Sequence, residues 1–160
     1  MNKNVLFVVQ AALIAAVYTV LTVIIAPYSY GIFQFRVSEV LTVLPAVIPS
    51  AIPGLFVGCL VSNLIGGFGI VDIIFGSLAT LISAVLSRVL RKYPYMVPLP
   101  PVVINAVIVG GYLHFLYFSD LPLLSCMGWV ALGEILACYV LGYPLLLLLK
   151  KRFGRYFEDI

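Results

Sequence analysis

The sequence predicts an all-α integral membrane protein, a compact bundle of six transmembrane helices in a single domain that covers residues 1–160. Of the 160 residues, 64% are hydrophobic and only 9% are charged, whereas soluble domains carry about 25% charged residues. The apolar runs are long and unbroken, which favours helices over membrane strands, where apolar and polar residues alternate. At about 20 residues for each spanning helix, a chain of this length holds about six spans.

Six apolar segments are delimited by the residues that break them. Pro27 and the residues after it end the first span, which has no clear cleavage site and is therefore expected to be a retained span rather than a signal peptide. Pro45 and Pro49 interrupt the second segment, so it is expected to be short and kinked. Glycines near 67 separate the third from the fourth, prolines precede the fifth, and Pro122 marks the turn before the sixth. The expected segments cover about residues 5–26, 36–49, 52–66, 71–90, 99–118 and 125–149.

Basic residues predict the orientation. Eight of the nine lie at Lys3, in the 88–92 group and in the 150–155 group. With an even number of crossings these three groups share one side of the membrane, and the positive-inside rule makes that side cytoplasmic. We therefore expect a multi-pass protein of the plasma membrane with both termini in the cytoplasm. The basic residues lie at the ends of apolar segments, where they indicate topology. The net charge of +3 therefore does not indicate nucleic-acid binding.

Topology does not explain five charged side chains, which are Arg36, Glu39, Asp72, Asp120 and Glu134. A charge at the centre of a membrane helix costs about 2.5–3.5 kcal/mol, so such residues normally face a protected interior and are functional candidates. Asp120 lies in a turn and is expected to be solvated. Glu134 has no basic residue within one helical turn on either side, which makes it the strongest single candidate for a binding site.

Alternatives stay open for the other three. Arg36 and Glu39 are three residues apart, so they either form an ion pair within one helical segment or direct at least one charge towards a ligand. Asp72 begins the fourth span, where an acid also interacts favourably with the helix dipole. Asn63 and Asn105 either bind a ligand or simply hydrogen-bond between helices.

Aromatic residues make up 13% of the chain, and many of them, Phe35 and Trp129 among them, lie near expected span ends. Interfacial belts explain much of this pattern. Acids, amides and aromatic rings together also suit a flat heteroaromatic ligand that carries N–H donors or an amine. The three cysteines show no metal-ligand spacing, so neither a metal nor another cofactor is expected.

Catalytic motifs are missing from the sequence, which contains no HExxH, no Walker A and no GxSxG. The chain is therefore predicted not to be an enzyme, and energy for active uptake has to come from partner subunits or an ion gradient. The first span carries a stripe of small residues, Ala11, Ala12, Ala15 and Ala16, that allows another helix to approach closely. This stripe either packs internally or docks a partner.

The stretch FQFRVSEVLTVLP at residues 33–45 resembles the motif of the queuosine-precursor transporter family, the QueT-type substrate-binding S components of energy-coupling factor (ECF) transporters. The resemblance covers nearly the whole chain, and its specific part is the RxSE stretch. It implies a subunit that binds a micronutrient on the outer side. That subunit then topples in the membrane against one transmembrane coupling subunit and two cytosolic ATPase subunits.

The same resemblance implies the ligand 7-aminomethyl-7-deazaguanine. Glu134 and Glu39 are then expected to face its guanidine-like edge or its ammonium, with Asn105 and Asp72 completing the polar contacts and an aromatic ring stacking on the base. Docking would use Ala11 with Ala15 or, preferably, Ala12 with Ala16. Alternatives are an S component or small permease for another vitamin or purine-like solute, an intramembrane enzyme, and an assembly subunit.

Overall fold

The structure is a computed structural model that describes residues 2–29, 35–67 and 69–157. Helices make up nearly all of these ranges, which contain no strand, so the predicted compact all-α fold is confirmed. Residues 33 and 34 of the quoted motif lie outside the described ranges. In chain order the elements are α1 Lys3–Ile24, α2 Ala26–Ser29, η1 Val37–Ala46, α3 Ala51–Gly66, η2 Asp72–Gly76, α4 Ser77–Val89, η3 Leu90–Lys92, η4 Pro94–Met96, α5 Leu99–Leu116, α6 Leu123–Glu134, η5 Ile135–Gly142 and α7 Tyr143–Phe157.

Six apolar helical segments correspond to the six predicted ones. Among the described residues, four are long and apolar enough to cross a membrane, namely Lys3–Ile24, Asp72–Lys92, Pro94–Leu116 and Leu123–Arg152. The other two, Val37–Ala46 and Ala51–Gly66, are shorter than the roughly 20 residues that a span needs. The expectation that the second segment is short is confirmed, because it is a 3₁₀ helix of ten residues with Pro45 inside it.

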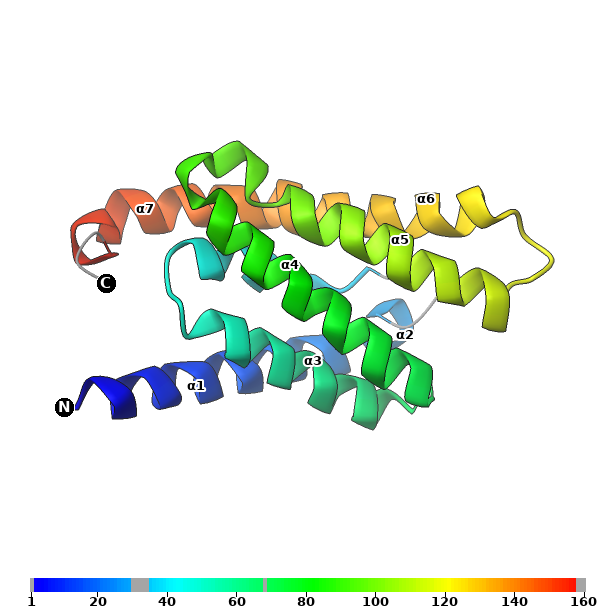
Figure 1. Cartoon of the computed structure of the whole chain (residues 1–160), viewed down its shortest axis with the longest axis horizontal. Coiled ribbons are helices and arrows are strands. Elements are labelled where there is room, and N and C mark those ends of the chain that lie inside the picture. The colour runs from blue at the N-terminus through cyan, green and yellow to red at the C-terminus, as the bar shows by residue number, and fades with distance from the viewer. Residues whose placement is uncertain (1, 30–34, 68, 158–160) are drawn as a thin grey trace.

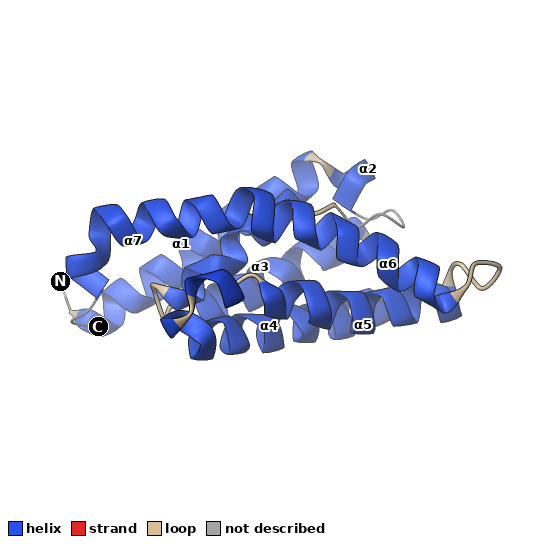
Figure 2. Ribbon diagram, turned by 90° about the horizontal axis from the view of Figure 1, so that it is seen from above, coloured by secondary structure: helices blue, strands red, loops and turns tan. Residues whose placement is uncertain are grey.

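The helices form two pairs around a central element (Figures 1 and 2). Helix α1 packs along α3, α5 packs along α6, and α4 contacts both α3 and α5. The short helix η1 lies between them and contacts η5, α4 and α1. Residues of η1 therefore reach the middle of the bundle, where helices from distant parts of the chain meet.

Two segments of this bundle are π-helices, η2 at Asp72–Gly76 and η5 at Ile135–Gly142. Such wider turns are uncommon and are often found at functional sites. Each begins at a predicted site residue, since Asp72 is the first residue of η2 and Glu134 immediately precedes η5. The irregular helical turns thus coincide with the buried acids.

The alanine stripe of α1 is divided between an inner and an outer face. A Cβ atom added at Gly54 would lie 2.7 Å from the carbonyl oxygen of Ala11, and one added at Gly58 would lie 2.9 Å from that of Ala15. Ala11 and Ala15 therefore pack closely on α3. Ala12 and Ala16 lie on the exposed face of the helix.

The start of α1 and the end of α7 lie at the same end of the bundle in Figure 1. Two of the predicted basic groups meet there, because Lys150 Nζ donates a hydrogen bond to the carbonyl oxygen of Arg91 at 2.9 Å. Lys3 begins α1 at this end as well. The predicted clustering of positive charge on one side of the molecule therefore agrees with the fold.

Candidate functional site

The predicted polar site residues are all buried in the bundle, and they come from five different elements or their boundaries. They are Arg36, Glu39, Asn63, Asp72, Asn105 and Glu134, none of which is more than 4% exposed. Asp120, predicted to be solvated, is exposed. Charged groups are rarely buried without a partner, so the partners of these side chains decide what the site can do.

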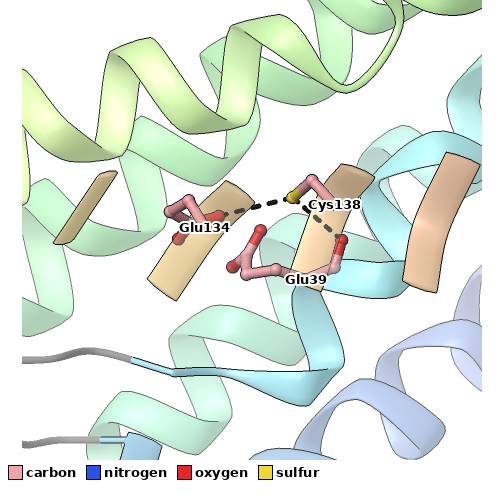
Figure 3. Close-up of side chains that lie close together, drawn as sticks. All are labelled: Glu39, Glu134 and Cys138. Carbon is pink, nitrogen blue, oxygen red and sulfur yellow. Dashed lines mark hydrogen bonds between the residues drawn. The ribbon is translucent and has the colours of Figure 1, made fainter. Parts of the chain in front are cut away.

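Glu39 of η1 and Glu134 of α6 place their carboxylates close together. With the thiol of Cys138, their ligand atoms all lie within 4.8 Å of one another, and Figure 3 shows the three side chains pointing towards each other. Glu134 and Cys138 are brought to the same place by the junction of α6 with η5, whereas Glu39 comes from the central helix η1. This Glu39–Glu134 pair is the most acidic part of the interior.

Neutral groups donate the hydrogen bonds that this pair receives. Tyr18 of α1 donates its hydroxyl to Glu39 Oε1. Asn105 Nδ2 donates to Glu134 Oε1 at 2.7 Å, and Cys138 Sγ lies 3.4 Å from Glu134 Oε2. No Lys or Arg side chain is within ion-pair distance of either carboxylate among the described residues.

The third buried acid has a charged partner. Arg36 Nη2 lies 3.4 Å from Asp72 Oδ1 in an ion pair that joins two distant parts of the chain. Tyr112 of α5 also donates its hydroxyl to Asp72 Oδ1. Arg36 therefore pairs with Asp72 and not, as one sequence-based alternative had it, with Glu39 in the same segment. Asp72 binds the Arg36 guanidinium and the Tyr112 hydroxyl in addition to any interaction with a helix dipole.

Asn63 connects the Arg36–Asp72 pair to α3. Its Nδ2 donates to the Asp72 carbonyl oxygen at 3.0 Å and lies 3.6 Å from Cys59 Sγ. Thr80 Oγ1 donates to the same sulfur at 3.3 Å. Asn63 thus orients the first turn of η2, and its other amide atom, Oδ1, faces the interior without a donor.

Three of the predicted site residues each present a buried oxygen that receives no hydrogen bond. These atoms are Glu39 Oε2, Asn63 Oδ1 and Asp72 Oδ2. Leaving a buried acceptor unsatisfied costs about 1–3 kcal/mol, and more for a charged group. The protein therefore maintains a set of acceptors whose donors are not supplied by the described residues.

The two predicted aromatic site residues occupy different surroundings. Phe35 packs with Val102, Ala137 and Cys138 and so lies beside the Glu39–Glu134 pair. Trp129 on α6 is 46% exposed. Phe35 is therefore the better placed ring for a ligand at the buried acids.

Sequence reasoning missed Tyr18, Tyr112 and the two site cysteines. None of the four is among the residues that the sequence predicts for the site. Both tyrosines donate to buried carboxylates, and Cys59 and Cys138 contact polar site atoms. Tyr18 could have been identified from the sequence, since a phenol in the middle of an apolar helix needs a hydrogen-bond partner when it is buried.

The spacing of Glu39, Glu134 and Cys138 is also compatible with a bound metal ion. Thiolate and carboxylate are ligands that Zn²⁺ accepts, although structural zinc sites usually have four protein ligands. The described residues supply three here. The arrangement therefore suits a cation in general, either a metal ion or a positively charged group of a ligand.

Comparisons with known proteins point to a transporter. The family model described as QueT transporter matches residues 8–151. A curated relative, "Queuosine precursor transporter QueT" of Lactococcus lactis subsp. cremoris (strain MG1363), is 38% identical over 77 residues, which is 47% of this chain. The alignment spans 45% of that relative's own length. No solved structure matches the chain.

Proposed function

This chain belongs to the QueT transporter family, and on that premise we propose that it is the membrane-embedded S subunit of an ECF uptake transporter. Its ligand is a queuosine precursor, 7-aminomethyl-7-deazaguanine, captured from the outer side of the plasma membrane. The printed name of the Lactococcus relative supports this substrate class. The resemblance of the RxSE stretch to the family motif supports it as well.

The excess of buried acceptors is the observation that carries the choice of ligand. Glu39 Oε2, Asn63 Oδ1 and Asp72 Oδ2 receive no donor from the part of the chain that the structure describes. The proposed ligand is rich in donors, because its pyrimidine edge carries N–H groups and its side chain carries an ammonium. Hydrogen bonds between an ionised donor or acceptor and its partner are about twice as strong as neutral ones, so these contacts would account for selective binding.

Hydrophobic contacts complete the proposed site. A deazaguanine ring is flat, and aromatic pairs in offset or edge-to-face arrangements contribute about 0.5–1.5 kcal/mol beyond area burial. Phe35 lies in the apolar cluster with Val102 and Cys138, next to the acidic pair. We assign the stacking role to Phe35.

The energy for uptake is proposed to come from an ECF module with one transmembrane coupling subunit and two cytosolic ATPase subunits. The chain itself has no Walker A motif. Ala12 and Ala16 are exposed on α1, and small residues permit the close helix–helix packing on which association in lipid depends. We propose this outer face as the docking surface, with both termini in the cytoplasm beside the basic groups.

Calorimetric titration of the purified chain tests the ligand. We expect saturable binding of 7-aminomethyl-7-deazaguanine and binding of guanine that is weaker by about tenfold or more, as expected for loss of one charge-assisted contact. A panel of vitamins is the control and should not bind. Preferential binding of a vitamin or of another purine-like solute would replace the proposed ligand, and no binding at all would contradict the S-subunit role.

A further inference from the structure

We propose that the Glu39–Glu134 pair is a subsite for a primary ammonium group, and that the neutral N–H edge of the same ligand lies towards Asp72 and Asn63. This proposal rests on the proposed function, because it orients one ligand within that site. It divides the site by charge: one end binds a cation and the other binds neutral donors.

Charge distribution is the first argument. Asp72 is compensated within the protein by Arg36, whose Nη2 is 3.4 Å away. Glu39 and Glu134 receive hydrogen bonds from Tyr18 and Asn105, which are neutral donors. A ligand cation at the Glu39–Glu134 pair would supply the opposite charge that Asp72 already has.

Geometry is the second argument. The Glu39 and Glu134 ligand atoms lie within 4.8 Å of each other, so a nitrogen placed between them can approach both at the 2.7–2.9 Å of a charge-assisted hydrogen bond. Glu39 Oε2 has no hydrogen-bond partner among the described residues, although Glu39 is only 1% exposed. In Figure 3 its carboxylate faces Glu134 and Cys138. An ammonium has three N–H donors, which suits the oxygens of two carboxylates.

Low polarity around the pair strengthens the preference for a cation. Like charges at this separation repel one another more strongly in a buried site than in water. A cation between the two carboxylates converts that repulsion into two attractions, whereas a hydroxyl of the same size can only form neutral or singly assisted hydrogen bonds. The subsite should therefore distinguish ligands by charge more than by shape.

Neutral donors suit the opposite end. Asp72 Oδ2 and Asn63 Oδ1 are both buried and without donors, and Asn63 Nδ2 holds the Asp72 carbonyl oxygen at 3.0 Å. Two acceptors fixed on neighbouring elements can accept from the adjacent N–H groups of a pyrimidine edge. A second cation is not required there because Arg36 is already present.

Two ligands of matched size test the proposal, 7-aminomethyl-7-deazaguanine and 7-hydroxymethyl-7-deazaguanine. They differ only in an ammonium against a hydroxyl. We expect the wild-type protein to bind the aminomethyl compound about 10- to 100-fold more tightly, as for a hydrogen bond to a charged group.

In Glu134→Gln this preference should fall by about tenfold, while the affinity for the hydroxymethyl compound stays nearly unchanged and thereby reports a folded site. Asp120→Asn removes the same charge from an exposed turn and should retain the full preference.

The outcomes separate this proposal from the proposed function. Equal affinity of the wild-type protein for both ligands, or an equal loss for both in Glu134→Gln and in Glu39→Gln, would overturn the ammonium subsite while the S-subunit role stands. Binding that requires added Zn²⁺ and disappears with a chelator would also overturn it, since a metal ion would then fill the pair. Failure of the wild-type protein to bind either compound would contradict the proposed function itself.

Discussion

Two acidic regions of the interior differ in how their charge is balanced. Asp72 is held by the Arg36 guanidinium and the Tyr112 hydroxyl, so the protein itself completes most of its contacts. Within the described ranges, the donors to the Glu39–Glu134 pair are neutral. The difference supports our proposal that the Glu39–Glu134 pair binds the cationic group of the ligand, whereas Asp72, already paired with Arg36, accepts from its neutral donors.

One short segment supplies both regions. Arg36 precedes η1 and reaches across to Asp72, whereas Glu39, three residues later, faces Tyr18 and Glu134. Arg36 precedes η1 with an extended backbone, whereas Glu39 lies in the first turn of that helix, so the two side chains do not share a helix face. The start of the helix thus separates the charge that pairs with Asp72 from the charge that lies beside Glu134.

The largest expected effect is a loss of stability when the Arg36–Asp72 ion pair is broken. Asp72→Asn leaves the Arg36 guanidinium buried without its carboxylate, and breaking a buried ion pair in this way costs about 3–5 kcal/mol. We expect that loss in the free energy of unfolding, measured by denaturation in mixed micelles without ligand. The same isosteric change in Glu39→Gln should lower the free energy of unfolding by less than about 1 kcal/mol, because no basic partner is left behind. Equal losses in the two variants would abolish the distinction between the regions.

The two tyrosines provide a matched pair of smaller changes. Tyr18→Phe removes the one donor that the described residues give to the Glu39 carboxylate, and an unsatisfied buried acceptor costs about 1–3 kcal/mol. Tyr112→Phe leaves Asp72 with Arg36 and should cost about 0.5–1.5 kcal/mol, the value of an ordinary hydrogen bond. Thermal unfolding of both variants in one detergent makes the comparison. A larger loss for Tyr112→Phe would contradict it.

The inner and outer faces of α1 extend the comparison from charge to packing. Ala15→Leu introduces bulk where α1 contacts Gly58, and overpacking of this kind costs about 1–3 kcal/mol.

Ala12→Leu lies on the exposed face and should change the free energy of unfolding by about 0.5 kcal/mol or less. Ligand binding should persist in this variant while co-purification with the coupling subunit is lost. Co-purification at the wild-type level from Ala12→Leu and from Ala16→Leu would place docking on another surface. Wild-type stability in Ala15→Leu would show that the α1–α3 contact tolerates a larger side chain.

Much of the fold follows from composition and from the residues that break helices. The apolar runs and prolines predicted the helical segments to within a few residues, and the scarcity of charge selected Arg36, Glu39, Asp72 and Glu134, all of which are buried. These predictions succeed because the cost of placing charge or unsatisfied backbone in lipid is large and local. A single sequence carries that information directly.

The pairing of those charges could not be obtained in the same way. The prediction that Arg36 and Glu39 share a face assumes that both lie in one helix, but Arg36 has an extended backbone and precedes η1. The partner of Arg36 lies 36 positions away in η2, and long-range contacts are set by packing of whole elements. Likewise, the sequence does not show which alanines of α1 pack inside the bundle. The structure shows it, because Gly54 and Gly58 lie against Ala11 and Ala15.

The central claim is that the acceptor-rich interior binds the donor-rich ligand through Glu134. Calorimetric titration of wild-type and Glu134→Gln protein with 7-aminomethyl-7-deazaguanine tests it most directly. We expect saturable binding to the wild-type chain and an affinity weaker by about tenfold in the variant, as expected for loss of a charge-assisted contact. Wild-type affinity in Glu134→Gln would remove this carboxylate from the site and contradict the account.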